Sequence, residues 1–120
     1  MEPVQSIRTV TTRWNGVKLT RDQVRSLFLH TAIARELRSR ESEGIEIARR
    51  NIALMRSVNP HAAPLLDEWE RILQGSIDQI VDSMLDPGFR GQDLRQVTPF
   101  GGILTPTQRA DVYRSFTGTA

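Results

Sequence analysis

Residues 20–39 read TRDQVRSLFLHTAIARELRS, and this stretch decides the fold class. Projected at about 100° per residue, its apolar side chains fall on one helix face and its arginines mostly on the other. Thr20 and Gln23 have the spacing of a capping box, in which each side chain bonds the other residue's backbone amide. We therefore expect a helix from Thr20 to about Ser39. Its apolar face consists of Leu27, Leu29, His30, Ile33, Ala34 and Leu37.

Further helices are predicted by apolar periodicity and by start and stop signals. In the segment after residue 41, Ile47 and Leu54 widen a stripe of apolar side chains at helical spacing. Asn59-Pro60 ends that segment, because a residue before proline avoids the α region. We expect helices over about residues 42–57, 62–73, 76–85 and 90–96, and a last one from 105 that frays over 117–120.

Residues 1–19 differ in composition from the rest of the chain. Two short runs flank Asn15-Gly16, a pair that favours a type I′ turn. A small hairpin and a flexible arm both remain open, because an isolated hairpin is only marginally stable in water. The chain thus divides into an N-terminal arm (1–19) and a helical domain (20–117). The predicted fold class is all-α: a compact bundle of five to six helices with an extended or hairpin-like N-terminal arm.

Composition excludes several classes of protein. The chain has 120 residues, which fits one domain, and it contains no cysteine. Disulfides, thiolate zinc sites and cysteine nucleophiles are therefore excluded. No segment approaches the roughly 18 consecutive apolar residues of a membrane span, and residues 1–13 contain no apolar signal region. These features predict a cytoplasmic protein without membrane contact.

The charge of the chain is unevenly distributed. Residues 1–58 carry a net charge of +5 and residues 59–120 a net charge of −3, which together give the overall +2. Such asymmetry indicates either an anionic partner for the first half or complementary halves within one fold or a homodimer.

The sequence contains no recognisable catalytic or metal-binding motif. His30 and His61 are the only histidines, and neither has the i,i+4 spacing of a metal-binding helix. His30 falls on an apolar helix face, where a core histidine is a commoner interpretation than a ligand or a pH switch. Asp78, Asp82 and Asp86 recur every four residues and are interpreted as a solvated face. We therefore predict a non-enzymatic protein without catalytic residues, metal ligands or cofactors.

No nucleophile elbow, Walker loop or dinucleotide fingerprint is present either. The one glycine pair in an apolar loop, Gly101-Gly102, is interpreted as a turn that lets Phe100 and Ile103 pack inward.

Partner-binding residues are predicted on the first helix and in the arm. The polar face of the first helix carries arginines, which bind carboxylates or phosphates. Trp14 lies outside any apolar period, so it either docks onto its own bundle or anchors a partner. The predicted partner-binding set is Trp14, Arg21, Arg25, Arg35 and Arg38.

The C-terminal half resembles a known group of proteins. The run PLLDEWERIL (64–73) is followed by DLRQVTPF (93–100), then by Gly102, Leu104 and a terminal helix with Arg109 and Tyr113. Over about residues 25–117 the chain resembles small, all-helical bacterial proteins that act as antitoxin-like or regulatory partners. The resemblance implies a protein that binds another protein, and it supplies no catalytic residues.

Two functions are therefore carried forward. The first is a non-enzymatic antitoxin-like protein that binds and neutralises a partner toxin. The alternative is a DNA-binding transcriptional regulator, in which the arginines of the first two helices neutralise phosphates. Glutamates interspersed among these arginines weaken the positive field that nucleic acid requires.

Overall fold

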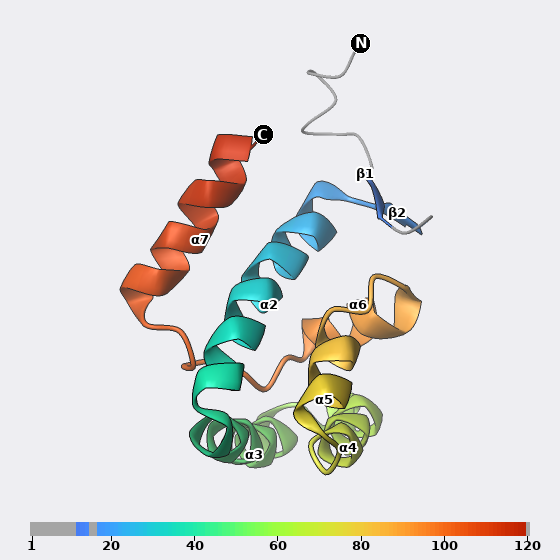
Figure 1. The fold of residues 1–120 in the computed structure, drawn as a ribbon. Coiled ribbons are helices and arrows are strands. Elements are labelled where there is room, and N and C mark those ends of the chain that lie inside the picture. Colours follow the sequence, from blue (N-terminus) through green and yellow to red (C-terminus); the bar gives the residue numbers. More distant parts are fainter. Residues whose placement is uncertain (1–11, 15–16, 120) are drawn as a thin grey trace.

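The computed structural model describes residues 12–14 and 17–119 (Figure 1). Within those residues every regular element except one short hairpin is a helix, so the predicted all-α bundle is confirmed. The elements are β1 (Thr12–Trp14), β2 (Val17–Leu19), α2 (Arg21–Ser39), α3 (Glu41–Val58), the 3-10 turn η1 (Pro60–Ala62), α4 (Ala63–Ile72), α5 (Ile77–Met84), α6 (Phe89–Gln96) and α7 (Pro106–Thr119).

Three helices begin at capping boxes, of which the first, Thr20 with Gln23, is predicted above. At the start of α2, the Gln23 amide donates to the Thr20 hydroxyl at 3.2 Å, and the Thr20 amide donates to the Gln23 side chain at 2.8 Å. Ser76 with Gln79 forms the same pair of bonds at α5, and Thr105 with Gln108 forms it at α7. Each box satisfies amides that a helix leaves without internal partners.

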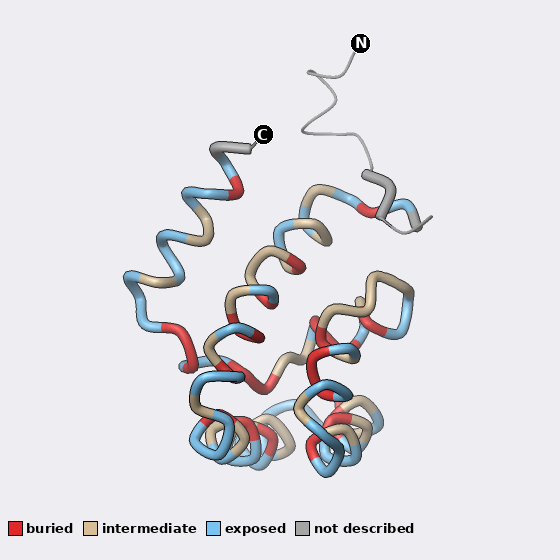
Figure 2. Tube along the Cα trace, in the orientation of Figure 1, coloured by how far each residue is buried: buried red, intermediate tan, exposed pale blue. Residues whose placement is uncertain are grey.

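Helix α2 is the central element of the bundle. It packs against β2, α3, α5 and α7, whereas α7 lies beside α2 and apart from α4, α5 and α6 (Figure 1). Buried positions gather on the inner sides of α2, α3, α4 and α5 (Figure 2). Leu37, Ala48, Leu66 and Ile80 are each fully buried in one continuous core.

The N-terminal segment that the structure describes is a hairpin. β1 and β2 pair antiparallel, with Thr12 opposite Leu19 and Trp14 opposite Val17. Leu19 is fully buried, and β2 packs on α2. The hairpin alternative therefore applies to residues 12–14 and 17–19, while residues 1–11 and 15–16 of the predicted arm lie outside the described residues.

Trp69 joins α4 to α6 and to the loop that follows α6. Its side chain is fully buried, and its indole nitrogen donates a hydrogen bond of 2.9 Å to the Leu94 carbonyl. Its ring meets the Phe100 ring edge to face, with centroids 5.4 Å apart. One residue therefore connects α4, α6 and the following loop in the C-terminal half.

The loop over residues 97–105 is packed inside the bundle by its apolar residues. Phe100 and Ile103 are each 1% exposed, while Gly102 between them has φ of +94°, a conformation that favours glycine. The Asn51 amide donates to the Pro99 and Gly101 carbonyls, both at 2.8 Å, and Arg40 donates to the Ile103 carbonyl at 2.6 Å. The predicted inward turn is confirmed.

Two details of the sequence interpretation are wrong. Leu54 is 65% exposed, because the side of α3 that is buried in the core carries Gly44, Ala48 and Ile52. Asp86 does not belong to a solvated face, since its carboxylate accepts the amide hydrogens of Gly88 and Gly91. The last helix, α7, extends to Thr119.

Gly91 explains why α6 tolerates a glycine. A Cβ at Gly91 would lie 1.9 Å from the Asp86 carbonyl oxygen, whereas a Cβ at Gly101 would meet nothing within 4 Å. We predict that Gly91→Ala lowers the free energy of unfolding by about 3 kcal/mol or more, because the backbone must shift. Gly101→Ala, the matched control, should change it by less than about 0.5 kcal/mol. Chemical denaturation measures both, and equal stabilities of the two variants would contradict the close packing of α6 on the Asp86 turn.

Candidate functional site

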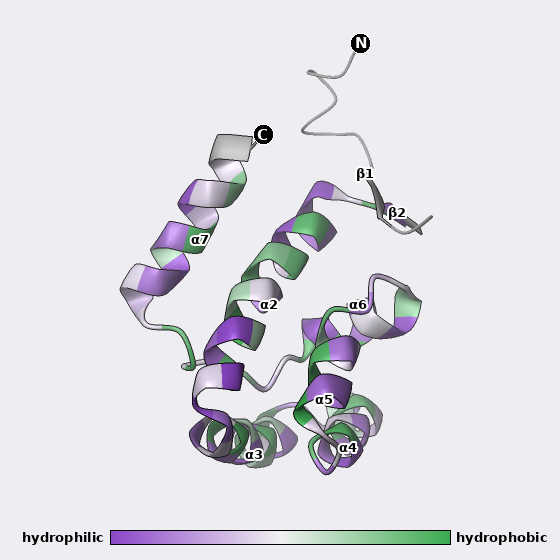
Figure 3. Cartoon of the chain, in the orientation of Figure 1, coloured by the Kyte–Doolittle hydropathy of each residue, from purple (hydrophilic) through white to green (hydrophobic). Residues whose placement is uncertain are grey.

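Two of the predicted arginines lie against α7. The Arg21 guanidinium is stacked over the Phe116 ring, 4.8 Å from its centroid, and the Arg25 guanidinium over the Tyr113 ring at 4.3 Å. Phe28 meets Phe116 edge to face at 5.3 Å. These contacts attach α7, whose surface is largely polar (Figure 3), to the N-terminal half of α2. Cation–π contacts of this kind contribute about 0.5–1 kcal/mol each at exposed sites.

The other predicted partner-binding residues are placed differently. Arg35 is exposed on the same side of α2, where it borders shallow hollows between α2 and α7 together with Asp111. Arg38 lies towards α5, and its guanidinium is 2.9 Å from the Asp78 carboxylate. Trp14 belongs to β1, but its side chain lies outside what the structure describes. The structure thus brings Arg21, Arg25 and Arg35 together along α7 and separates Arg38 from them.

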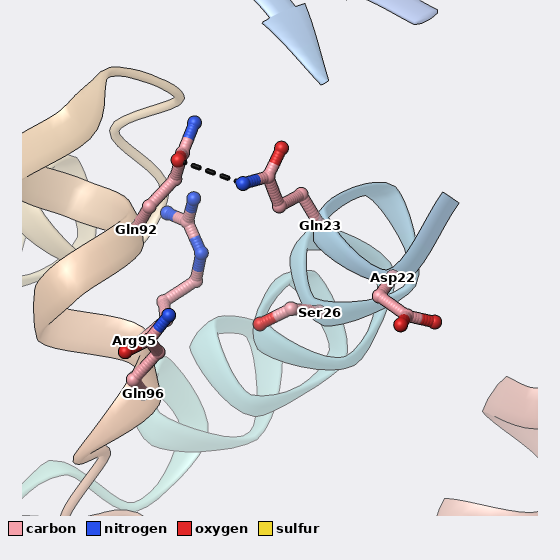
Figure 4. Close-up of a pocket in the computed structure, with 6 residues that line it drawn as sticks. All are labelled: Asp22, Gln23, Ser26, Gln92, Arg95 and Gln96. Carbon is pink, nitrogen blue, oxygen red and sulfur yellow. Dashed lines mark hydrogen bonds between the residues drawn. The ribbon is translucent and has the colours of Figure 1, made fainter. Parts of the chain in front are cut away.

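A crevice separates the N-terminal half of α2 from α6 (Figure 4). We call it the α2–α6 crevice; its volume is about 160 Å³. An amide bridge crosses it, in which Gln23 Nε2 donates to Gln92 Oε1 at 2.8 Å. The crevice is lined by Asp22, Gln23, Ser26, Gln92, Arg95 and Gln96.

Arg95 lies in this crevice and is only 5% exposed. Its Nη1 donates to the carbonyls of Met84 at 3.1 Å and Asp86 at 2.6 Å, so it caps the C-terminal end of α5. Its Nη2 is buried and has no hydrogen-bond partner among the described residues. Burial lowers the pKa of Arg95, and the nearby Asp86 partly offsets this. Arg95 is not predictable from the sequence, because nothing about a single arginine in a short helix indicates burial.

His30 is the second buried polar residue, at 1% exposure. Its Nδ1 lies 2.8 Å from the Ser26 carbonyl oxygen, and since a carbonyl only accepts, Nδ1 carries the proton. Nε2 is buried without a hydrogen-bond partner in the described part of the chain. Burial lowers the pKa of His30 to about 4, and the positive charge of Arg95 adds to this. The predicted core position is confirmed, and the ring is neutral at pH 7.

The outer side of α3 carries apolar side chains that face solvent. Leu54 is 65% and Val58 77% exposed, and they lie four residues apart, on one side of the helix. Half-buried Ile47 continues this row towards the N-terminal end of α3. Arg50, also exposed, lies beside Leu54 and forms no ion pair or hydrogen bond with any described residue. We call Ile47, Arg50, Leu54 and Val58 the α3 stripe.

The described residues contain no candidate metal cluster and no helix that could span a membrane, and no known protein matches the chain. In the described ranges, no group of three or more His, Cys, Asp or Glu side chains is placed to hold a metal ion. None of the helices described has the length and apolarity needed to cross a membrane. No family model matches the chain, and no curated protein or solved structure matches it.

His30 predicts a pH dependence of stability. Its pKa in the folded state is about 4, against 6.5 as the ordinary value. Between these values the unfolded chain binds more protons, so the free energy of unfolding falls as the pH is lowered from 6.5 towards 4. The loss should reach about 3 kcal/mol at most.

Denaturation across this pH window tests the prediction. His30→Leu should reduce the slope of stability against pH, because leucine does not titrate. His61→Gln alters the other histidine, which is exposed on η1, and should leave the slope unchanged. A wild-type slope in His30→Leu would show that other groups account for the acid sensitivity.

Proposed function

We propose that this chain is a non-enzymatic, antitoxin-like protein that binds and neutralises a partner protein through the α3 stripe. The exposure of Leu54 and Val58 is the observation that carries the proposal. A single exposed apolar residue is ordinary, but two large ones on one side of a helix, in line with Ile47, form a surface that a partner can cover. A helix face laid against a groove is a common mode of protein recognition.

The charge beside the stripe indicates the chemistry of the partner. Arg50 has no carboxylate partner among the described residues, whereas Arg56 on the same helix pairs with Asp67 at 2.7 Å and with Glu70 at 2.8 Å. A free arginine at the rim favours a partner with a carboxylate next to its apolar contact residues. We therefore expect an apolar groove with an acidic rim on the partner.

The placement of the α2 arginines favours this function over DNA binding. Arg21 and Arg25 are stacked on rings of α7, and Arg38 is paired with Asp78. Phosphate contacts would therefore compete with contacts that these guanidinium groups already make within the fold. A DNA-binding regulator remains the alternative, and it predicts binding that collapses as salt is raised.

The placement of His30 supports a non-enzymatic function. General acid–base catalysis needs a titrating group with a partner at the site of reaction. The His30 ring contacts only Ser26 by hydrogen bonding among the described residues, and its pKa of about 4 keeps it neutral at pH 7.

Co-expression with the product of the adjacent gene tests the proposed function. We predict that this product arrests growth when expressed alone, and that the wild-type chain restores growth and co-purifies with it. Leu54→Glu/Val58→Glu should abolish both effects, because carboxylates placed in an apolar interface are desolvated without partners.

Phe89→Glu is the matched control. Phe89 is 84% exposed at the start of α6, so the variant makes the same chemical change on another surface and should retain rescue. Thermal unfolding should show that all variants fold. Retained rescue by Leu54→Glu/Val58→Glu, or a harmless neighbouring product, would reject the proposal. Salt-sensitive DNA binding that is lost in Arg21→Ala/Arg25→Ala would favour the regulator instead.

A further inference from the structure

We propose that the α2–α6 crevice is a binding site for a small oxyanion, of the phosphate or carboxylate class, with Arg95 as its principal ligand. This site is independent of the α3 stripe, because it is built from residues of α2 and α6.

The Arg95 guanidinium is buried without a full set of partners among the described residues. A buried charge is costly unless it is paired and hydrogen-bonded. Arg95 is 5% exposed, and no carboxylate lies within ion-pair distance of it among the described residues. Two backbone carbonyls use Nη1, while Nη2 remains without a partner. An oxyanion would supply both the missing negative charge and the missing acceptor.

The crevice next to Arg95 has space for an anion. The volume of about 160 Å³ is far above the roughly 10–15 Å³ that one water molecule needs. Figure 4 shows the Arg95 side chain extending between α6 and α2 towards the Gln23–Gln92 amide bridge. Nη2 is shielded from solvent, so we expect the anion to displace this bridge as it binds. The freed amide of Gln23 then becomes a further donor to the anion.

The crevice lies at the first turns of α2. The N-terminal end of a helix carries a partial positive charge, which favours an anion. The Ser26 hydroxyl, which lines the same crevice one turn further on, is an additional donor.

One carboxylate of the crevice carries the same sign of charge as an anion and therefore opposes its binding. Asp22 also lines the crevice, and its exposed carboxylate points away from Arg95 (Figure 4). Replacing it with asparagine removes a negative charge at the edge of the crevice without disturbing the core. Asp22→Asn should therefore bind the anion about twofold more tightly at low salt, because like charges repel.

The experiment is titration of the protein with inorganic phosphate, and separately with acetate, followed by amide chemical shifts. Shifts should concentrate at Gln23, Ser26, Gln92 and Arg95, and Asp22→Asn should lower the dissociation constant. Asp82→Asn is the matched control: it removes an exposed carboxylate of α5 that does not line the crevice, with the same change in net charge. It should leave the dissociation constant unchanged. Preference for phosphate or for acetate identifies the class of anion.

Arg95→Gln should abolish the localised shifts, and its unfolding curve shows whether α5 and α6 survive the loss of the cap. Asp22→Asn keeps the test decisive if Arg95→Gln fails to fold. If neither anion shifts the amide signals of the crevice at about 10 mM, the dissociation constant is too weak for a built site. That result would overturn the proposal. Equal tightening by Asp22→Asn and Asp82→Asn would also overturn it, because net charge alone would then explain the effect.

Discussion

The buried contact between Trp69 and the carbonyl of Leu94 is the constraint on which the C-terminal half depends. The indole is fully enclosed, so its N–H must find an acceptor inside the protein, and an unmade bond there costs about 1–3 kcal/mol. The acceptor belongs to α6, and the ring also meets Phe100 of the following loop. Helix α4, helix α6 and the loop are therefore placed by one side chain. The chain after Phe100 then passes to α7, which lies against α2 (Figure 1).

Around this contact the bundle has an apolar end and a polar end. The C-terminal half of α2 contributes Ile33, Ala34 and Leu37 to the core. The N-terminal half instead carries His30 and faces Arg95, and each of these buried residues has one nitrogen without a partner in the described chain. Buried polar groups are normally satisfied, so the unpaired Nη2 of Arg95 is the observation on which the anion proposal depends.

The surfaces of the two proposals are separate. The α3 stripe combines exposed apolar side chains with the charged Arg50, which suits a protein partner. The α2–α6 crevice is small and contains the buried Arg95, which suits an anion. Since the two surfaces share no residue, a partner protein can bind the α3 stripe whether or not an anion is bound in the crevice. Two arginines of the face that the sequence predicts for binding also contribute to the fold, because stacking of Arg21 on Phe116 and of Arg25 on Tyr113 attaches a helix with little apolar surface of its own.

The sequence by itself determined the helices and their starts, because capping boxes, apolar periodicity and proline stops act within a few residues. Thr20, Ser76 and Thr105 all begin helices as expected. The inward turn at Gly101-Gly102 and the buried position of His30 could be predicted for the same local reason. Only the tertiary structure decided which side of α3 is buried, since Leu54 and Ile52 are equally apolar and the distinction depends on what packs against the helix. It alone placed Arg95 in the interior and turned Asp86 onto two backbone amides, because these roles depend on partners from other elements of the fold.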